Sequence, residues 1–365
     1  MGVYKKEVKV SPVSRNSNIE LLRLVLIFMV VLLHFNNDGM GGAFCLVKDN
    51  ALNNFTLHFF ESLSVCAVNC FMIVSGYFLL TNRRVAFGKV VDILLIVVFY
   101  RVFDYLMQVL FFSESFSLKN FCIRFLPVNY FAIYYVVCYV LSPYIAQVWD
   151  KLEDRTADFL IALLLMIFIL IPTGLDAMAD LHIFPTISKS LSPISMMGNG
   201  EGYTIIQFFV MLSLGMWLRK RQLKFSSWFL IGTYLVSSLI MTVFIAKLPS
   251  LYNYCSIFTV VTAVCIFLLF SKLDFQNKGI NYCAKSCFAI FCIHTSGFAL
   301  SIWQNYFITE SHLKAGIVST VLWTLISVGS MFFCCLVLSI VMRLIFGKLK
   351  SYFCGLFPEH VANWK

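Results

Sequence analysis

Apolar side chains occur along this chain in long runs that are separated by short polar segments. The runs are roughly 17 to 25 residues long, and a helix of that length crosses a hydrocarbon core about 30 Å thick. The pattern therefore predicts an all-α polytopic membrane protein with about ten transmembrane helices. The expected spans are 20–36, 60–80, 90–112, 128–147, 158–173, 203–218, 227–246, 253–271, 282–304 and 316–342.

Positive charges in the connecting segments predict which side of the membrane each segment faces. If the N-terminus is cytoplasmic, the inner segments carry about three times as many Lys and Arg residues as the outer ones, which is the usual bias of membrane proteins. Both termini are therefore predicted to be cytoplasmic, with a tail at 1–17, a transmembrane domain at 18–346 and a tail at 347–365. Two longer outer segments, 37–59 and 174–202, either cover a substrate entrance or serve as connectors.

Composition supports the membrane class and accounts for the net charge. Hydrophobic residues make up 60% of the chain and charged residues 13%, against roughly 45–50% and about 25% in soluble proteins. The net charge of +10 follows from the basic inner segments, and no groove-reading motif accompanies it, so no nucleic-acid partner is expected. The 13 cysteines lie mostly in apolar runs without metal-ligand spacing. We interpret them as packing residues and expect no metal site.

The first apolar run carries two ionisable residues, Arg23 and His34. At 100° per residue their spacing is only about 20° from three full turns, so both lie on one helical face, about 16 Å apart along the axis. Glu20 lies one turn before Arg23 and can orient its guanidinium group. With the N-terminus inside, Arg23 lies at the cytoplasmic edge and His34 lies toward the outer face.

Each of these two residues also has a simpler interpretation. The long side chain of Arg23 can extend to the cytoplasmic interface, and His34 can be an outer interfacial residue, because Asn36 and Asn37 follow it. An ionisable group within a membrane span indicates function by default, and the shared helical face strengthens that interpretation.

Further polar residues lie inside the predicted spans. Arg101 and Asp104 are one turn apart in the third span, and an internal ion pair is the favoured interpretation. Ser75 can serve close helix packing, and His294 is either hydrogen-bonded within the bundle or part of the same cavity as His34. The candidates for lining such a cavity are Asn69, Ser75, Arg101, Tyr139 and His294.

Five segments, taken in order, resemble the acyltransferase 3 family of integral membrane proteins. They are RNSNIELLRLVLIFMVVLLH, VNCFMIVSGYFLL, NYFAIYYVVCYVLSPY, EGYTIIQFFVMLSLGMWLRK and FAIFCIHTS, and the first has ten residues between its arginine and its histidine. The resemblance covers nearly the whole chain. This sequence departs from the family in the basic segment after the second span, where many relatives carry arginines spaced before a proline. Here the segment contains Arg83, Arg84 and Lys89.

The resemblance implies a reaction and roles for particular residues. Bacterial members O-acylate surface polysaccharides and related glycans, which implies transfer of an acyl group, most often acetyl, from cytoplasmic acyl-CoA to a sugar hydroxyl at the inner membrane. Acyl-CoA is then a co-substrate, and no tightly bound cofactor is implied. His34 would be the catalytic residue, either as general base or as transient acyl carrier. Arg23, Glu20, Arg83 and Arg84 would bind or orient the donor.

Two other functions share these sequence features. A transporter or flippase for a lipid-linked sugar also needs polar residues within its spans, although many transporters show paired repeats or broken helices, and neither is evident here. A non-catalytic subunit of a polysaccharide-export complex would tolerate apolar residues in place of the polar stripe. Within the enzyme class, the sequence leaves the acyl group open between acetyl, succinyl and longer chains.

Overall fold

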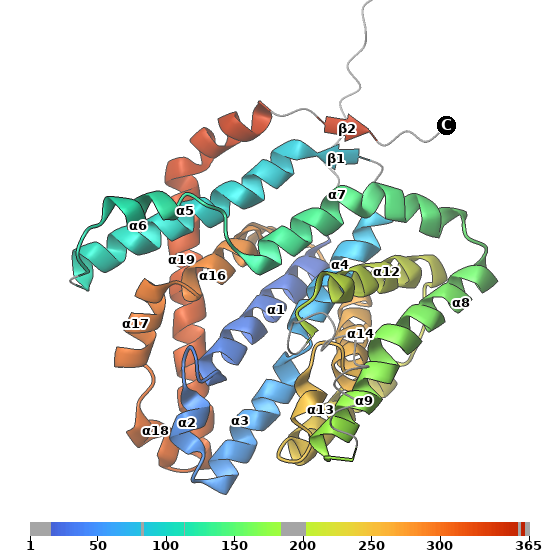
Figure 1. The fold of residues 1–365 in the computed structure, drawn as a ribbon, viewed down its shortest axis with the longest axis horizontal. Helices are drawn as coiled ribbons and strands as arrows, with labels where there is room; N and C mark the ends of the chain where they lie inside the picture. Colours follow the sequence, from blue (N-terminus) through green and yellow to red (C-terminus); the bar gives the residue numbers. More distant parts are fainter. Residues whose placement is uncertain (1–15, 82–83, 113, 184–201, 357–358, 362–365) are drawn as a thin grey trace, which may run out of the picture.

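The fold is that of a computed structural model, which describes residues 16–81, 84–112, 114–183, 202–356 and 359–361. Helices account for most of these residues (Figure 1). The first half of the chain forms α1 (Ser17–Asn36), α2 (Ala43–Val47), α3 (Ala51–Ser64), α4 (Ala67–Leu79), β1 (Arg84–Ala86), α5 (Phe87–Phe111), α6 (Leu118–Ile123), α7 (Tyr130–Lys151), α8 (Asp154–Leu165), the π-helix η1 (Met166–Leu170) and α9 (Ile171–Asp180). The second half forms α12 (Ile205–Arg221), α13 (Ser227–Phe244), the 3₁₀-helix η3 (Pro249–Tyr252), α14 (Ile257–Ser271), α15 (Lys278–Cys283), the 3₁₀-helix η4 (Ala284–Ser286), α16 (Cys287–His294), α17 (Gly297–Tyr306), α18 (Glu310–Lys314), α19 (Ile317–Gly355) and β2 (Glu359–Val361).

Helix α1 lies in the middle of the bundle (Figure 1). It contacts α3, α4, α14, α16 and α19, so elements from both halves of the chain surround it. Leu22, Leu26 and Val31 on α1 are completely buried in these contacts. The central position also brings the polar residues of α1 next to other helices.

Two glycines bring the backbones of α4 and α12 into direct contact. A Cβ atom at Gly76 would lie 1.9 Å from the carbonyl oxygen of Leu212, and one at Gly215 would lie 2.2 Å from the carbonyl oxygen of Ile73. Only glycine therefore fits at these two positions, because any Cβ atom would collide with the backbone of the facing helix. Apolar lipid provides little hydrophobic driving force between helices, so such close van der Waals packing helps to hold α4 and α12 together.

All ten predicted spans coincide with helices, which confirms the all-α class. Within the described residues, seven helical segments are long and apolar enough to cross a membrane, or eight if the pair formed by α15–α16 and α17, bent by 78°, is one span. The other two predicted spans are α5, which carries several charged residues, and α12, which has 17 residues. The count of ten stays a prediction. Helix α19, with 39 residues, continues beyond 346, the predicted end of the transmembrane domain.

Segments that the charges predict on the same side of the membrane gather together in the fold. Oγ of Ser17 donates to Oδ1 of Asn281 over 2.9 Å and accepts a hydrogen bond from the backbone N–H of Asn277 over 2.8 Å. The strands β1 and β2, from two segments predicted to be inner, pair with each other in antiparallel orientation. On the predicted outer side, Nδ2 of Asn53 donates to the carbonyl oxygen of Leu313 over 2.9 Å. Which end faces the cytoplasm stays a prediction.

Both of the long outer segments contain helix. In the first, α3 begins at Ala51, because Oδ1 of Asn50 caps the backbone N–H of Asn53. In the second, α9 continues to Asp180, whose Oδ2 accepts a hydrogen bond from the backbone N–H of Ser250. Residues 184–201 of this second segment lie outside the described residues.

The Gly76 contact gives a stability prediction with a matched control. We expect Gly76→Ala to destabilise the protein by about 1–3 kcal/mol, because the added methyl group forces α4 away from the backbone of α12. Gly232→Ala on α13 adds a methyl group where nothing lies within 4 Å, so it should leave stability equal or higher. The apparent unfolding temperature of the purified protein in detergent measures both. Equal unfolding temperatures for the two variants would contradict this account of the α4–α12 contact.

Candidate active site

Helix α1 presents Arg23 and His34 on one face because it is continuous from Ser17 to Asn36. The predicted contact of Arg23 with Glu20 is confirmed, since Nη1 of Arg23 lies 3.2 Å from Oε2 of Glu20. The side chain of Glu20 is 12% exposed and that of Arg23 is 36% exposed. The carboxylate therefore fixes the direction of the guanidinium group, while part of that group remains accessible to a ligand.

His34 meets His294 of α16, which is 260 residues away in the chain. Nδ1 of His34 lies 2.7 Å from Nε2 of His294, and the ring centroids are 4.9 Å apart with 30° between the ring planes. His294 is completely buried and His34 is partly buried. Phe291, one turn before His294, lies against both rings. The two histidines therefore form one unit between α1 and α16.

The hydrogen bonds assign the tautomers of both rings. Nδ1 of His294 lies 2.7 Å from the carbonyl oxygen of Ile290, and because a carbonyl only accepts, this nitrogen carries the proton. Nε2 of a neutral His294 is then an acceptor, so the Nδ1–H group of His34 donates to it. Nε2 of His34 consequently carries a lone pair, and within the described part of the chain it has no hydrogen-bond partner.

The backbone around His34 is fixed by the turn that follows α1. The N–H of Gly41 donates to the carbonyl oxygen of His34 over 2.9 Å. A Cβ atom at Gly41 would lie 2.2 Å from the carbonyl oxygen of Phe35, so only glycine allows this approach. The turn thus closes directly over the end of α1 and holds the backbone that carries the imidazole.

Aromatic and basic side chains gather toward the other end of the polar face of α1. Nζ of Lys89 lies over the rings of Tyr139 and Tyr135, at 4.3 Å and 5.7 Å from their centroids. Tyr135 is also an electrostatic neighbour of Arg23. The cations of α1 and α5 therefore share one neighbour on α7, Tyr135.

The strand that precedes α5 involves two further predicted residues, Arg84 and Tyr139. Arg84 is exposed at the start of β1, where it is paired in register with Val361 of β2. Arg83 lies outside the described residues. The hydroxyl of Tyr139 accepts a hydrogen bond from the backbone N–H of Ala86 over 3.1 Å, so this predicted cavity residue anchors β1 to α7.

Asn69 and Ser75 satisfy their hydrogen bonds within the helix packing. Nδ2 of Asn69 donates to the carbonyl oxygen of Tyr254 over 2.7 Å, and Nε2 of Gln207 contacts both Oδ1 of Asn69 and that same carbonyl. Oγ of Ser75 donates to the carbonyl oxygen of Phe71 in its own helix over 2.9 Å. Both residues therefore have structural contacts, and the structure does not bring them to the histidine pair.

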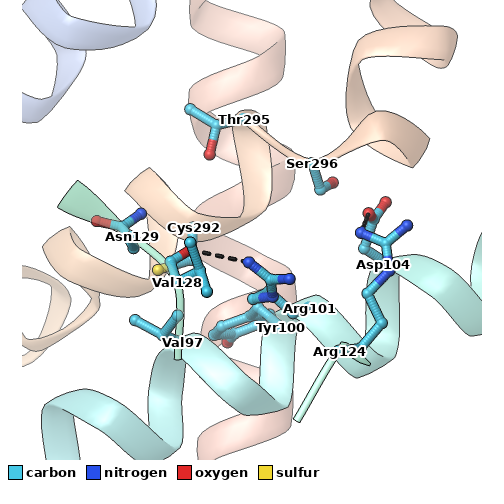
Figure 2. A pocket seen from close by; sticks show the side chains of 10 residues that line it. All are labelled: Val97, Tyr100, Arg101, Asp104, Arg124, Val128, Asn129, Cys292, Thr295 and Ser296. Carbon is cyan, nitrogen blue, oxygen red and sulfur yellow. Dashed lines mark hydrogen bonds and ion pairs between the residues drawn. The ribbon is translucent and has the colours of Figure 1, made fainter. Parts of the chain in front are cut away.

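A cavity of about 230 Å³ lies where α16 ends, directly after His294 (Figure 2). Three parts of the chain contribute to it: the middle of α5, the segment between α6 and α7, and the end of α16 with the break that follows it. Arg101 is the one candidate from the sequence that lines this cavity. The polar lining residues are Tyr100, Arg101, Asp104, Arg124, Asn129, Thr295 and Ser296.

The predicted ion pair between Arg101 and Asp104 is wrong. Oδ2 of Asp104 instead lies 3.8 Å from Nη1 of Arg124, and Oδ1 accepts hydrogen bonds over 2.9 Å from Nε2 of Gln108 and from the backbone N–H of Phe298. The carboxylate of Asp104 is thus bound by a residue at the end of α6, by a residue of its own helix and by a backbone N–H at the start of α17. Sequence reasoning missed Arg124, because a basic residue between two spans carries no signal that it folds back onto a span.

Arg101 is left without a carboxylate partner. Its Nη1 donates to the carbonyl oxygen of Val128 over 2.9 Å, the contact drawn in Figure 2. Its Nε is buried and has no hydrogen-bond partner among the described residues. With two arginines and one aspartate, the cavity lining has one positive charge in excess.

The bundle and its buried histidine pair define a polytopic membrane protein with a site suited to acid–base chemistry. Residues 16–340 match the family model Acyl_transf_3, whose description is an acyltransferase domain. The chain therefore belongs to the acyltransferase 3 family, and the protein is a multi-pass membrane acyltransferase. No curated protein and no solved structure matches the chain. Arg23, His34 and His294 all lie within the matched residues.

The tautomer assignment gives a prediction that needs no substrate. In ¹⁵N-histidine-labelled protein in nanodiscs, solid-state NMR should show His34 protonated at Nδ1 and unprotonated at Nε2, because His294 accepts from Nδ1. His294→Ala should remove this preference, and a His34→Gln sample identifies the signals. Unprotonated Nδ1 together with protonated Nε2 in the native protein would contradict the assignment.

Proposed function

We propose that the protein transfers an acyl group, most often acetyl, from cytoplasmic acyl-CoA to a hydroxyl of a cell-surface or lipid-linked glycan. The observation that carries the proposal is the lone pair on Nε2 of His34, held in one tautomer by the buried His294. An imidazole has an ordinary pKa near neutrality, which suits it to take a proton from a hydroxyl group. Family membership limits the reaction to acyl transfer.

In the proposed reaction the oxygen of the acceptor hydroxyl forms a bond to the thioester carbonyl carbon, while Nε2 of His34 takes the hydroxyl proton. The tetrahedral intermediate then expels the sulfur of coenzyme A, and the proton on Nε2 passes to that sulfur. The products are the O-acyl glycan and the free thiol. His294 acts as a positioning residue, because its bond to Nδ1 keeps Nε2 directed at the substrate.

The donor would bind with its phosphates at the Arg23 end of α1. The partly exposed guanidinium of Arg23, oriented by Glu20, suits bidentate contact with a phosphate, and Lys89 adds a second charge nearby. About 16 Å of helix separates Arg23 from His34. The donor would therefore extend its long arm along the polar face to bring the thioester to His34.

The histidine pair predicts a graded loss of activity. His34→Ala should reduce acyl transfer about 10²–10⁴-fold, because the general base is lost. His294→Ala should cost about tenfold, the effect of losing one hydrogen bond of about 1.4 kcal/mol. His294→Asn should recover part of that loss, because its Oδ1 can accept from Nδ1 of His34. Mass spectrometry of the surface glycans of expressing cells measures their acyl content.

The control for these variants is His312→Ala, which removes an exposed histidine of α18 and should leave acyl transfer unchanged. Near-native glycan acylation by membrane-inserted His34→Ala would reject the proposal, and glycan movement without acylation would favour a transporter. Incubation with labelled acetyl-CoA and no acceptor tests whether His34 acts as a general base or as an acyl carrier. The base mechanism leaves the protein unlabelled, whereas label on His34 would identify it as an acyl carrier.

The proposed contact of Arg23 with the donor predicts that Arg23→Lys changes the KM for acyl-CoA. We expect the KM for acyl-CoA to rise several-fold to about tenfold while kcat changes little, because lysine keeps the charge but loses the planar, bidentate contact. Arg155→Lys, at an exposed position near the start of α8, is the matched control and should leave the KM unchanged. An unchanged KM in Arg23→Lys would instead assign Arg23 to the membrane interface.

A further inference from the structure

The 230 Å³ cavity is a separate place from the donor end of the bundle. Arg101 lies twelve residues after Lys89 on the same helix, which is about 18 Å along the axis. Thr295 and Ser296 of the lining follow His294 directly in the chain. The cavity therefore lies directly after His294 in the chain and, along α5, away from the donor end that contains Lys89. We take this as the end where an acceptor would arrive.

The size of the cavity suits one group of a substrate rather than a whole donor. Pockets for drug-sized ligands measure roughly 300–1,000 Å³, and this cavity is smaller. Its remaining hydrogen-bonding capacity suits a sugar. Asn129 uses Oδ1 to cap α7 and keeps its NH₂ group, and Thr295 donates to the carbonyl oxygen of Phe291 and keeps its acceptor lone pairs.

The charges of the cavity favour an anion. Asp104 is already engaged by Arg124, Gln108 and the N–H of Phe298, so its single negative charge is shared between two arginines. Arg101 is partly buried, and its positive charge attracts an anion. Its Nε atom is buried without an acceptor among the described residues, and such an unpaired donor carries an energetic cost. A carboxylate or phosphate oxygen would satisfy both at once.

We propose that this cavity is an acceptor subsite that binds an anionic group, a carboxylate or a phosphate, carried on a sugar. Arg101 is its principal ligand, and Arg124, which also lines the cavity, adds a second positive charge. The inference rests on the proposed function, because it assigns the cavity to the glycan that receives the acyl group. The acceptor is then an acidic glycan or a sugar phosphate, and its anionic group positions a hydroxyl near Nε2 of His34.

The test compares three small sugars that differ in charge. The full-length protein is placed in phosphatidylcholine nanodiscs, and NMR titration measures binding of methyl glucuronide, glucose 1-phosphate and the neutral methyl glucoside. At least one charged sugar should bind about tenfold or more tightly than the neutral one, as charge-assisted hydrogen bonds predict. A preference for the glucuronide identifies an acidic sugar as the source of the anion, and a preference for glucose 1-phosphate identifies a sugar phosphate.

Variants of the cavity complete the test. Arg101→Gln should remove the preference for the charged sugar, and Arg124→Gln should weaken it, whereas Arg155→Gln on the exposed surface should keep it. Equal binding of all three sugars, no binding of either charged sugar, or an unchanged preference in Arg101→Gln would overturn the proposal. The comparison of sugars on the native protein needs no variant, so misfolding of Arg101→Gln would not obstruct it.

The same assay separates this inference from the proposed function. His34→Ala should bind the charged sugar as the native protein does, because binding requires no acyl transfer. Charge-selective binding in a native protein that transfers no acyl group would reject the proposed function alone. Acyl transfer by a native protein without charge selectivity would reject the acceptor subsite alone.

Discussion

A polar group inside an apolar bundle must find a partner, and this constraint determines most of the interior of the protein. In a membrane an unsatisfied hydrogen-bonding group costs several kcal/mol, because no water replaces the missing partner. Asn69 and Gln207 meet the constraint by binding one backbone carbonyl together, and thereby join α4 and α12 to the segment before α14. His34 and His294 meet it by binding each other. The same constraint thus produces a contact between α4, α12 and the segment before α14 in one place, and an oriented pair of imidazoles in another.

Close backbone packing makes these partnerships possible. Gly76 and Gly215 let α4 and α12 approach until no Cβ atom fits between them, and Asn69 and Gln207 lie two turns along the same two helices. Helix α4 of this fixed pair also contacts α1, and α16 and α19 provide further contacts to α1. The imidazole of His34 is therefore placed by packing that begins far from it, and its tautomer is set by one buried carbonyl.

The sequence predicted what depends on local spacing and missed what depends on the path of the chain. The shared face of Arg23 and His34 and the contact with Glu20 follow from helical geometry, so both could be predicted. The histidine pair joins residues 260 positions apart, and the sequence could offer it only as one of two alternatives. Asp104 was assigned to its neighbour Arg101, whereas its partner is Arg124, because the short segment before α7 folds back across the end of α5. Local charge pairing is the default within a helix, and tertiary contacts override it here.

The arrangement along one axis explains why the polar residues are so far apart. A donor with charged phosphates belongs at an aqueous edge, while the transfer itself benefits from a site where water competes little with the acceptor hydroxyl. A single helix of about 16 Å between Arg23 and His34 separates these requirements and still joins them rigidly. The surplus charge at Arg101 lies in a cavity that is lined by the two residues directly after His294. In the function proposed above, charge on either side of the histidine pair would let two polar substrates reach it from different directions.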